Sequence, residues 1–200
     1  MTPQREDSAR LEKLLGDRYA DRAPRDETIS AVLDVILSRL QCARVSMWKF
    51  AGAGDKLTLL CLASKTADGV FDTSDRRLRR DEFIAYFNGL VGTGTYIAVD
   101  AMNDPKLQPM RESYLVANNV VSMLDAAFVL NNRTYGMVCC EEPQRREWRP
   151  SDVVSLRAIV NKLALLMWNA PDSVLLKNPS LPLRVLLDDS AQPKLDPRRR

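Results

Sequence analysis

The order of the predicted elements (helix, β-hairpin, helix, strand, helix, β-hairpin, helix) indicates an α+β fold whose mainly antiparallel sheet is covered by helices. Two observations carry this prediction. Apolar residues recur at spacings of three and four over residues 26–41, which is typical of an amphipathic helix with one buried stripe. Apolar runs at 44–50 and 56–64, and again at 120–130 and 135–141, are separated by turn sequences, as in β-hairpins.

Shorter elements are predicted around these hairpins. Residues 1–25 are polar and charged with one weak apolar cluster, and indicate a short helix that ends at Gly16 and need not pack on the domain. The other predicted elements are a polar connection over 65–77, a helix over 81–88 closed by Gly89 in a left-handed cap, a strand over 96–99 and a helix over 108–116.

The final predicted helix is apolar on nearly every side. Pro150 fits its first turn, Asp152 lies near its positive end, and apolar residues continue from 153 to 168. A helix of this kind must bury more than one face, so we expect it to pack on the sheet and on a second surface. A partner subunit is the simplest candidate for that surface.

The composition changes again after this helix, where Pro, Asp, Ser and Arg become frequent. We therefore expect three parts: an N-terminal extension over 1–25, a domain over 26–168, and a linker or docking tail over 169–200.

The composition excludes several kinds of chemistry. The 200 residues contain no histidine, which removes Ser-His-Asp and Cys-His catalysis, His-containing zinc sites and His-ligated haem. The 29 basic and 26 acidic side chains leave a net charge of only +3, which does not indicate a nucleic-acid-binding surface. We expect no metal and no cofactor.

Cys42, Cys61, Cys139 and Cys140 lack C-x-x-C spacing and are interpreted as buried thiols of a reduced protein. Adjacent residues of a strand point to opposite faces, so Cys139 and Cys140 are not expected to form a disulfide with each other. No apolar stretch approaches the roughly 18 residues of a membrane span. We therefore expect a soluble, cytoplasmic protein.

A series of short motifs resembles the GAF domain family, over about residues 26–168, and in particular a bacterial branch found beside histidine kinases and diguanylate cyclases. The motifs are Phe83 to Phe87, Ile97 to Asp100 with Asn103 to Pro105, Tyr114-Leu115, Ser122 to Ala126, Gly136 to Glu141, and Arg146 to Trp148.

The resemblance implies a GAF/PAS-like central antiparallel sheet of about six strands. The first and last helices would pack on one face, and loops and short helices would enclose a small-molecule pocket on the other. Asn161-Lys162 is all that matches the signature of cyclic-nucleotide-binding members, so that ligand is not supported. Without histidine, bilin attachment and His-ligated haem are not expected either.

The same resemblance suggests which side chains surround the pocket. They are Trp48, Cys61, Phe83, Tyr86, Phe87, Tyr114, Ser122, Leu124 and Cys139. For Phe83, Phe87 and Leu124 we favour plain core over a pocket role. The hydroxyls of Tyr86, Tyr114 and Ser122 need a partner when buried, which protein, water or a ligand could supply.

Asp125, Glu141, Arg146 and Trp148 could be a catalytic carboxylate pair with an arginine, but we favour a structural network in which an acid at a strand end pairs with Arg146. The predicted function is a non-catalytic sensory or regulatory module that binds a small molecule and dimerises through helices 26–41 and 151–168. The alternatives are a ligand-free interaction module and, more distantly, a cysteine-dependent redox enzyme.

Overall fold

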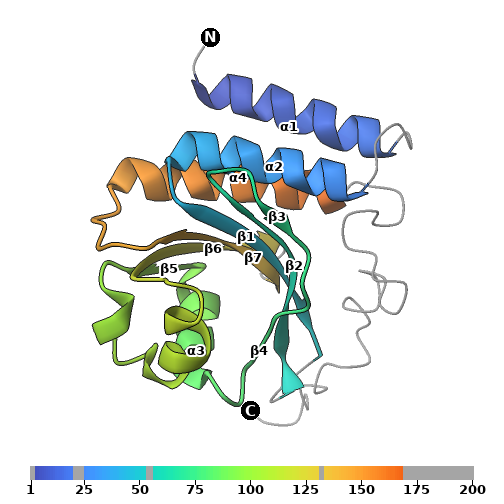
Figure 1. Cartoon of the computed structure of the whole chain (residues 1–200). Helices are drawn as coiled ribbons and strands as arrows, with labels where there is room; N and C mark the ends of the chain where they lie inside the picture. Colours follow the sequence, from blue (N-terminus) through green and yellow to red (C-terminus); the bar gives the residue numbers. More distant parts are fainter. Residues whose placement is uncertain (1–2, 20–24, 53–55, 131–132, 169–200) are drawn as a thin grey trace, which may run out of the picture.

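A computed structural model describes residues 3–19, 25–52, 56–130 and 133–168, so the predicted tail over 169–200 lies outside the described residues. The chain forms one antiparallel sheet in the order β3-β2-β1-β7-β6-β5, with β4 also paired to β2 (Figure 1). This confirms the predicted α+β class. The strands are β1 (Arg44–Ala51), β2 (Thr58–Thr66), β3 (Phe71–Asp72), β4 (Arg77–Arg79), β5 (Thr95–Ala98), β6 (Ser122–Leu130) and β7 (Arg133–Glu142).

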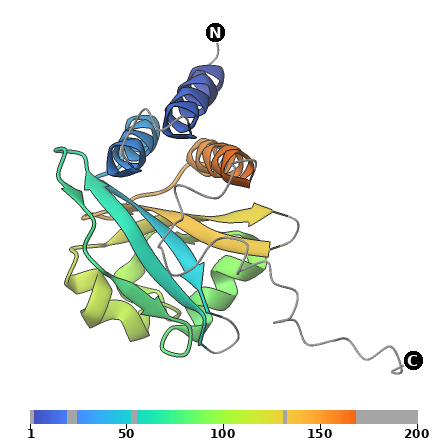
Figure 2. The ribbon, with the colours of Figure 1, turned by 90° about the vertical axis from the view of Figure 1, so that its right-hand side faces the viewer.

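Helices cover the sheet on both sides, as the two views in Figures 1 and 2 show. Helices α2 (Arg25–Leu40) and α4 (Pro150–Trp168) lie on one face, with α1 (Pro3–Tyr19) outside them. The other face carries α3 (Ile84–Thr93) and the short turns η2 (Ala101–Asn103), η3 (Gln108–Met110) and η4 (Arg111–Val116). The sequence predicted one helix over 108–116. The structure has a 3-10 turn at 108–110 followed by a π-helical turn at 111–116.

Burial on both faces divides the interior into two cores. The helical core, between the sheet and α2 and α4, includes Leu124 and Val138. The distal core, between the sheet and α3 with its neighbouring turns, includes Trp48, Met123 and Met137. Successive residues of β6 and β7 thus enter different cores, which explains why both strands are apolar at nearly every position.

Two predicted boundaries are wrong for physical reasons. The connection over 65–77 contains β3 and part of β4, both paired to β2 through their backbones, and each strand is only two or three residues long with one apolar side chain, Phe71 or Leu78. Gly89 lies inside α3, and the helix ends instead at Gly94, which has a φ of 71° and donates its backbone N–H to the Leu90 carbonyl. Both glycines follow an apolar stripe, so the stripe alone did not show which of them ends the helix.

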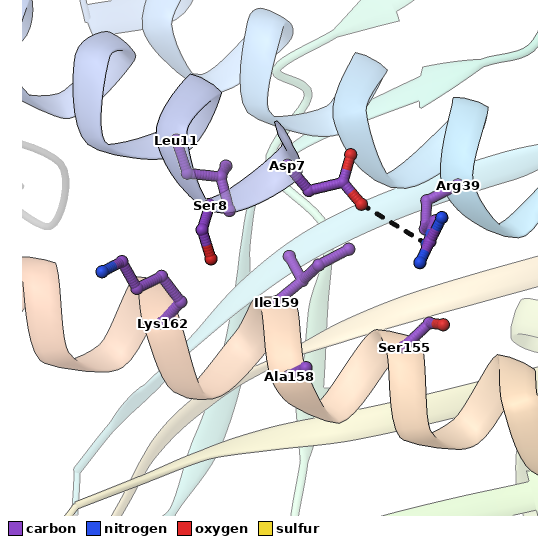
Figure 3. A pocket seen from close by; sticks show the side chains of 8 residues that line it. All are labelled: Asp7, Ser8, Leu11, Arg39, Ser155, Ala158, Ile159 and Lys162. Atoms are coloured by element: carbon purple, nitrogen blue, oxygen red, sulfur yellow. Dashed lines mark ion pairs between the residues drawn. The ribbon is translucent and has the colours of Figure 1, made fainter. Parts of the chain in front are cut away.

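Helix α1 is longer than predicted and packs on α2 and α4. It continues through Gly16, and Leu11 and Leu15 are only 1% and 0% exposed. Asp7 forms an ion pair with Arg39 of α2 at 3.4 Å. Figure 3 shows this pair beside a small cavity of about 20 Å³ that the side chains of Leu11 and Ile159 also line.

The second face of α4 is covered by the same chain. One side of α4 packs on β6, and another contacts α1 and α2. The expectation that α4 buries more than one face is confirmed, but α1 supplies part of the second surface. Val154 and Leu165 of α4 remain 61% and 50% exposed. Within the described residues, no helix combines the length and apolar character needed to span a membrane.

We expect α1 to contribute substantially to stability. Leu15→Ala should lower the free energy of unfolding by about 2–4 kcal/mol, because it leaves a cavity among buried side chains. Leu14→Ala, at the neighbouring half-buried position, should cost less than about 1.5 kcal/mol. Urea denaturation measures both, and equal small losses would contradict the packing of α1 on the domain.

Candidate functional site

The distal core is built around aromatic rings from β1, α3 and the turns. Trp48 and Tyr86 are fully buried. The Trp48 ring centroid lies 6.0 Å from that of Tyr114, and the Phe87 ring makes edge contacts with Tyr86 at 5.9 Å and with Phe50 at 5.8 Å. The structure brings together seven of the predicted pocket residues here: Trp48, Cys61, Phe83, Tyr86, Phe87, Tyr114 and Cys139.

The other two predicted pocket residues lie elsewhere. Leu124 faces the helical core. Ser122 Oγ donates to the Ala98 carbonyl at 2.9 Å and accepts from Trp148 Nε1 at 2.9 Å, so its hydroxyl is satisfied by protein. Because side chains alternate along β6, Ser122 and Leu124 cannot share the distal face with Met123. They are not brought together with the aromatic rings.

A buried acid, Asp125, forms one polar centre of the distal core. Its Oδ2 accepts a hydrogen bond of 2.7 Å from the Tyr86 hydroxyl, which also lies 3.1 Å from the Met137 sulfur. Its Oδ1 is buried without a hydrogen bond, beside the Cys139 thiol. Burial raises the pKa of Asp125 to about 7, against the opposing effect of its hydrogen-bond donors.

The second polar centre is a chain of charged and polar groups that starts at Tyr114. The Tyr114 hydroxyl donates to Glu141 Oε1 at 2.7 Å, and Arg44 Nε donates to Glu141 Oε2 at 2.5 Å. Burial acts to lower the pKa of Arg44, but the adjacent Glu141 carboxylate outweighs it and the pKa is raised. A buried ion pair with both carboxylate oxygens satisfied is the arrangement that such a charge requires.

Two further residues extend this second centre beyond the end of the sheet where β1 begins and β7 ends. Arg44 Nη1 and Arg76 Nη1 both approach the Asn118 side-chain oxygen, at 3.4 and 3.5 Å. Arg76 Nη2 donates to Ser64 Oγ at 2.5 Å and lies 3.2 Å from Asp72. A pocket of about 140 Å³ opens here, with Arg44, Asn118 and Glu141 in its wall.

Arg146 belongs to a different network from the one expected. It pairs with Glu142 at 2.7 Å and with Asp152 at 3.4 Å, and its Nη2 donates to the Leu40 carbonyl at 2.7 Å. Its guanidinium lies 4.1 Å from the centroid of the Trp148 ring. Arg146 therefore joins the end of β7 to the end of α2 and the start of α4, which supports a structural role. Asp125 and Glu141 are not its partners.

The cysteines are arranged as expected. All four are free and buried, and Cys139 lies in the distal core whereas Cys140 lies in the helical core. Burial raises the pKa of the Cys61 thiol to about 11. It also raises that of Cys139 well above its usual range. Both thiols are thus protonated at neutral pH and are poor nucleophiles.

Sequence reasoning missed Arg44, Arg76 and Asn118. One signal was available for Arg44, because alternation along β1 places it on the same face as Ser46 and Trp48. Arg76 and Asn118 lie in a connection and after a turn, where no periodicity assigns a face. In the described part of the chain, no three Cys, Asp or Glu side chains gather as they would to hold a metal ion.

These features define a class of α+β domain with one helical face and one enclosed face of aromatic and polar side chains. Residues 24–167 match the GAF domain, and the chain belongs to the GAF domain family. The match of the whole fold to solved GAF structures confirms the resemblance seen in the motifs. A search of curated proteins gives no match.

Solved structures share the fold at low identity. The phycoerythrobilin-bound GAF domain of a cyanobacterial phytochrome has 16% identity and a TM-score of 0.63, over 83% of this chain and 95% of that one. The blue-light-absorbing PixJ GAF domain of Thermosynechococcus elongatus has 16% identity and a TM-score of 0.59, over 71% and 83%. The chromophore-binding domain of an R. palustris bacteriophytochrome has 14% identity and a TM-score of 0.62, over 83% of this chain and 60% of that one.

The raised pKa of Asp125 predicts a pH-dependent stability. The folded protein holds a proton that the unfolded chain, with an Asp pKa near 3.8, has released, so the free energy of unfolding falls as the pH rises. Between about pH 4 and 7 the decrease from this group should be about 1.4 kcal/mol per pH unit, and it should level off above pH 7.

Asp125→Asn should remove this contribution and keep an oxygen for the Tyr86 hydroxyl. Urea denaturation of both proteins from pH 4.5 to 8 measures the difference. Asp75→Asn, at an exposed carboxylate, is the control and should keep the wild-type slope. An Asp125→Asn variant with the same slope as the wild type would show that Asp125 is already ionised at low pH.

Proposed function

We propose that the chain is a non-catalytic sensory or regulatory module, in which a small molecule bound on the distal side of the sheet changes the helical layer. One observation carries this proposal. Strand β7 contributes Cys139 and Glu141 to the distal side and Val138 and Cys140 to the helical core, so one strand contacts both layers. If a ligand on the distal side displaces β7, the helical core must also change, because protein interiors are closely packed.

Arg146 offers a direct route for the signal. It binds Glu142, the last residue of β7, and at the same time the end of α2 through Leu40 and the start of α4 through Asp152. A ligand that moves the end of β7 would therefore move both helices. In free energy, a ligand can shift the equilibrium between two arrangements of the helices only by the difference between its binding free energies to them.

The GAF relatives support a small-molecule ligand, since two of the solved structures described above contain bilins or chromophore-binding domains. Without histidine, we expect a different ligand in this chain: a small organic molecule held by hydroxyls, backbone and aromatic faces. The raised pKa values of the Tyr86 and Tyr114 hydroxyls and of the Cys139 thiol favour binding over catalysis, because each group stays protonated. The buried free thiols also support a reducing, cytoplasmic location.

We further propose that two copies associate through the helical layer. Helix α1 covers part of α2 and α4, so the surface left for a partner is the outer side of α4. Val154 and Leu165 are exposed there and lie 11 residues apart, about three helical turns, on the same side of the helix.

Sedimentation equilibrium tests this association. The wild type should be a dimer, and Val154→Lys combined with Leu165→Lys should be monomeric because charges replace both apolar contacts. Val70→Lys, at a residue that is 60% exposed in the connection between β2 and β3, is the control and should remain dimeric. A wild type that stays monomeric at high concentration would remove dimerisation from the proposed function.

Ligand sensing is tested by native mass spectrometry of freshly purified protein, followed by thermal shift against a metabolite library. A sensor should retain or bind a metabolite, and a ligand at 100 times its dissociation constant should add about 2.7 kcal/mol of stability. The protein should also show altered hydrogen exchange in α2 and α4. No bound metabolite and no stabilising compound would contradict sensing.

A ligand-free interaction module is the second candidate, and one observation favours it. The aromatic rings of the distal core pack on one another, and carboxylates already satisfy the Tyr86 and Tyr114 hydroxyls. Such a core needs no ligand to be stable. A dimer without any stabilising metabolite in the tests above would favour this candidate over the sensor.

A further inference from the structure

The pocket at the ends of the central strands β1 and β7 is large enough for a small organic molecule. It lies where β1 begins, β7 ends and the chain turns after η4, and its volume of about 140 Å³ is well above the ~10–15 Å³ that one water needs. Its wall is mixed: Arg44, Asn118 and Glu141 are polar, whereas Val120 and Pro143 are apolar. Asn119, also in the wall, has a φ of 52°, which fixes the loop that carries Asn118.

Hydrogen-bond donors outnumber acceptors around Asn118, which lines this pocket together with Arg44. Arg76, which is not in the wall, reaches the same Asn118 oxygen, so two guanidinium groups share it at 3.4 and 3.5 Å, whereas N–H donors usually approach an oxygen to about 2.7–3.2 Å. In addition, Arg44 Nη2 and Arg76 Nε are buried without any hydrogen-bond partner. Because buried polar groups are almost always paired, the two guanidinium groups beside Asn118 carry more donors than the protein supplies acceptors for.

The charges restrict what the missing acceptor can be. Arg44 faces Glu141 and Arg76 faces Asp72, so the two cations are balanced before any ligand binds. Glu142 also lines the pocket. A doubly charged anion such as phosphate would be repelled by these carboxylates, whereas a single carboxylate offers two oxygens for one charge. A short hydrocarbon tail would fit the apolar part of the wall.

We propose that this pocket binds a small aliphatic monocarboxylate, whose oxygens take the place of the Asn118 side-chain oxygen and accept hydrogen bonds from Arg44 and Arg76. The proposal rests on the proposed sensory function and revises its ligand contacts: the ligand is a carboxylate held by arginine donors, in place of the aromatic faces expected above. Asn118 is held by its own Nδ2, which donates to the Tyr114 carbonyl at 2.8 Å. Displacing Asn118 therefore acts on Tyr114, whose ring contacts Trp48 in the distal core.

The binding test uses NMR titration of the ¹⁵N-labelled wild type with sodium propionate, with sodium chloride keeping the ionic strength constant. Propionamide has nearly the same shape without the charge, and inorganic phosphate has more charge. We expect saturable shifts of the Arg44 and Arg76 Nε signals with propionate alone. No saturable shift, equal shifts with propionamide, or tighter binding of phosphate would each overturn the ligand class.

Variants test the location. Asn118→Asp supplies a carboxylate from the protein itself, so it should raise the Tm and weaken propionate binding by about tenfold or more. Asn88→Asp is the matched control, because the Asn88 oxygen also accepts from an arginine, Arg80, but lies on α3 outside the pocket wall. It should bind propionate like the wild type. Unchanged propionate affinity in Asn118→Asp would overturn the site.

A second variant keeps the test independent of how well Asn118→Asp folds. Arg76→Lys retains the charge but loses the forked donors, and should also weaken propionate binding about tenfold. The two proposals fail separately. A stabilising metabolite without a carboxylate would contradict this site and leave sensing intact. Propionate binding without any change in α2 and α4 would support the site and contradict the sensory function.

Discussion

The central strands of the sheet are buried on both faces, and this constraint governs the rest of the molecule. Most side chains of β1, β6 and β7 are shielded from water, so the buried polar groups that these strands carry depend on partners inside the protein. The strands nevertheless carry Asp125 and Glu141. Tyr86 satisfies one oxygen of Asp125, while Tyr114 and Arg44 satisfy both oxygens of Glu141. The positions of α3 and η4, which bring the two tyrosines, are therefore tied to the charges of the sheet.

The helical layer meets the same constraint with apolar packing and one arginine. Helix α1 packs its own Leu11 and Leu15 on α2 and α4. It thereby covers a part of the helical face that would otherwise need a partner subunit. Where β7, α2 and α4 meet, Arg146 donates hydrogen bonds to the buried acceptors, including the Leu40 carbonyl at the end of α2. The two layers thus have separate polar networks that adjoin at the end of β7, where Glu141 belongs to one and Glu142 to the other.

Much of this architecture could be predicted from periodicity, because the long elements have strong patterns. The apolar runs over 120–130 and 135–141 indicated a β-hairpin, and alternation placed Cys139 and Cys140 on opposite faces. What failed depended on tertiary contacts. Nothing local to the sequence tells Glu141 from Glu142 as the partner of Arg146. β3 and β4 are too short for their single apolar residues, Phe71 and Leu78, to form a recognisable pattern. Ser122 and Leu124 were grouped with the aromatic rings by motif, although alternation with Met123 separates them.

The buried Asp125 also has a consequence for the heat of unfolding. With a pKa of about 7 in the folded protein and near 3.8 in the unfolded chain, Asp125 releases about half a proton when the protein unfolds at pH 7. The buffer takes up that proton, and the heat that its protonation releases is subtracted from the heat absorbed on unfolding. Calorimetric enthalpies at neutral pH will consequently depend on the buffer, although the chain contains no histidine, the residue that usually causes such a dependence near neutrality.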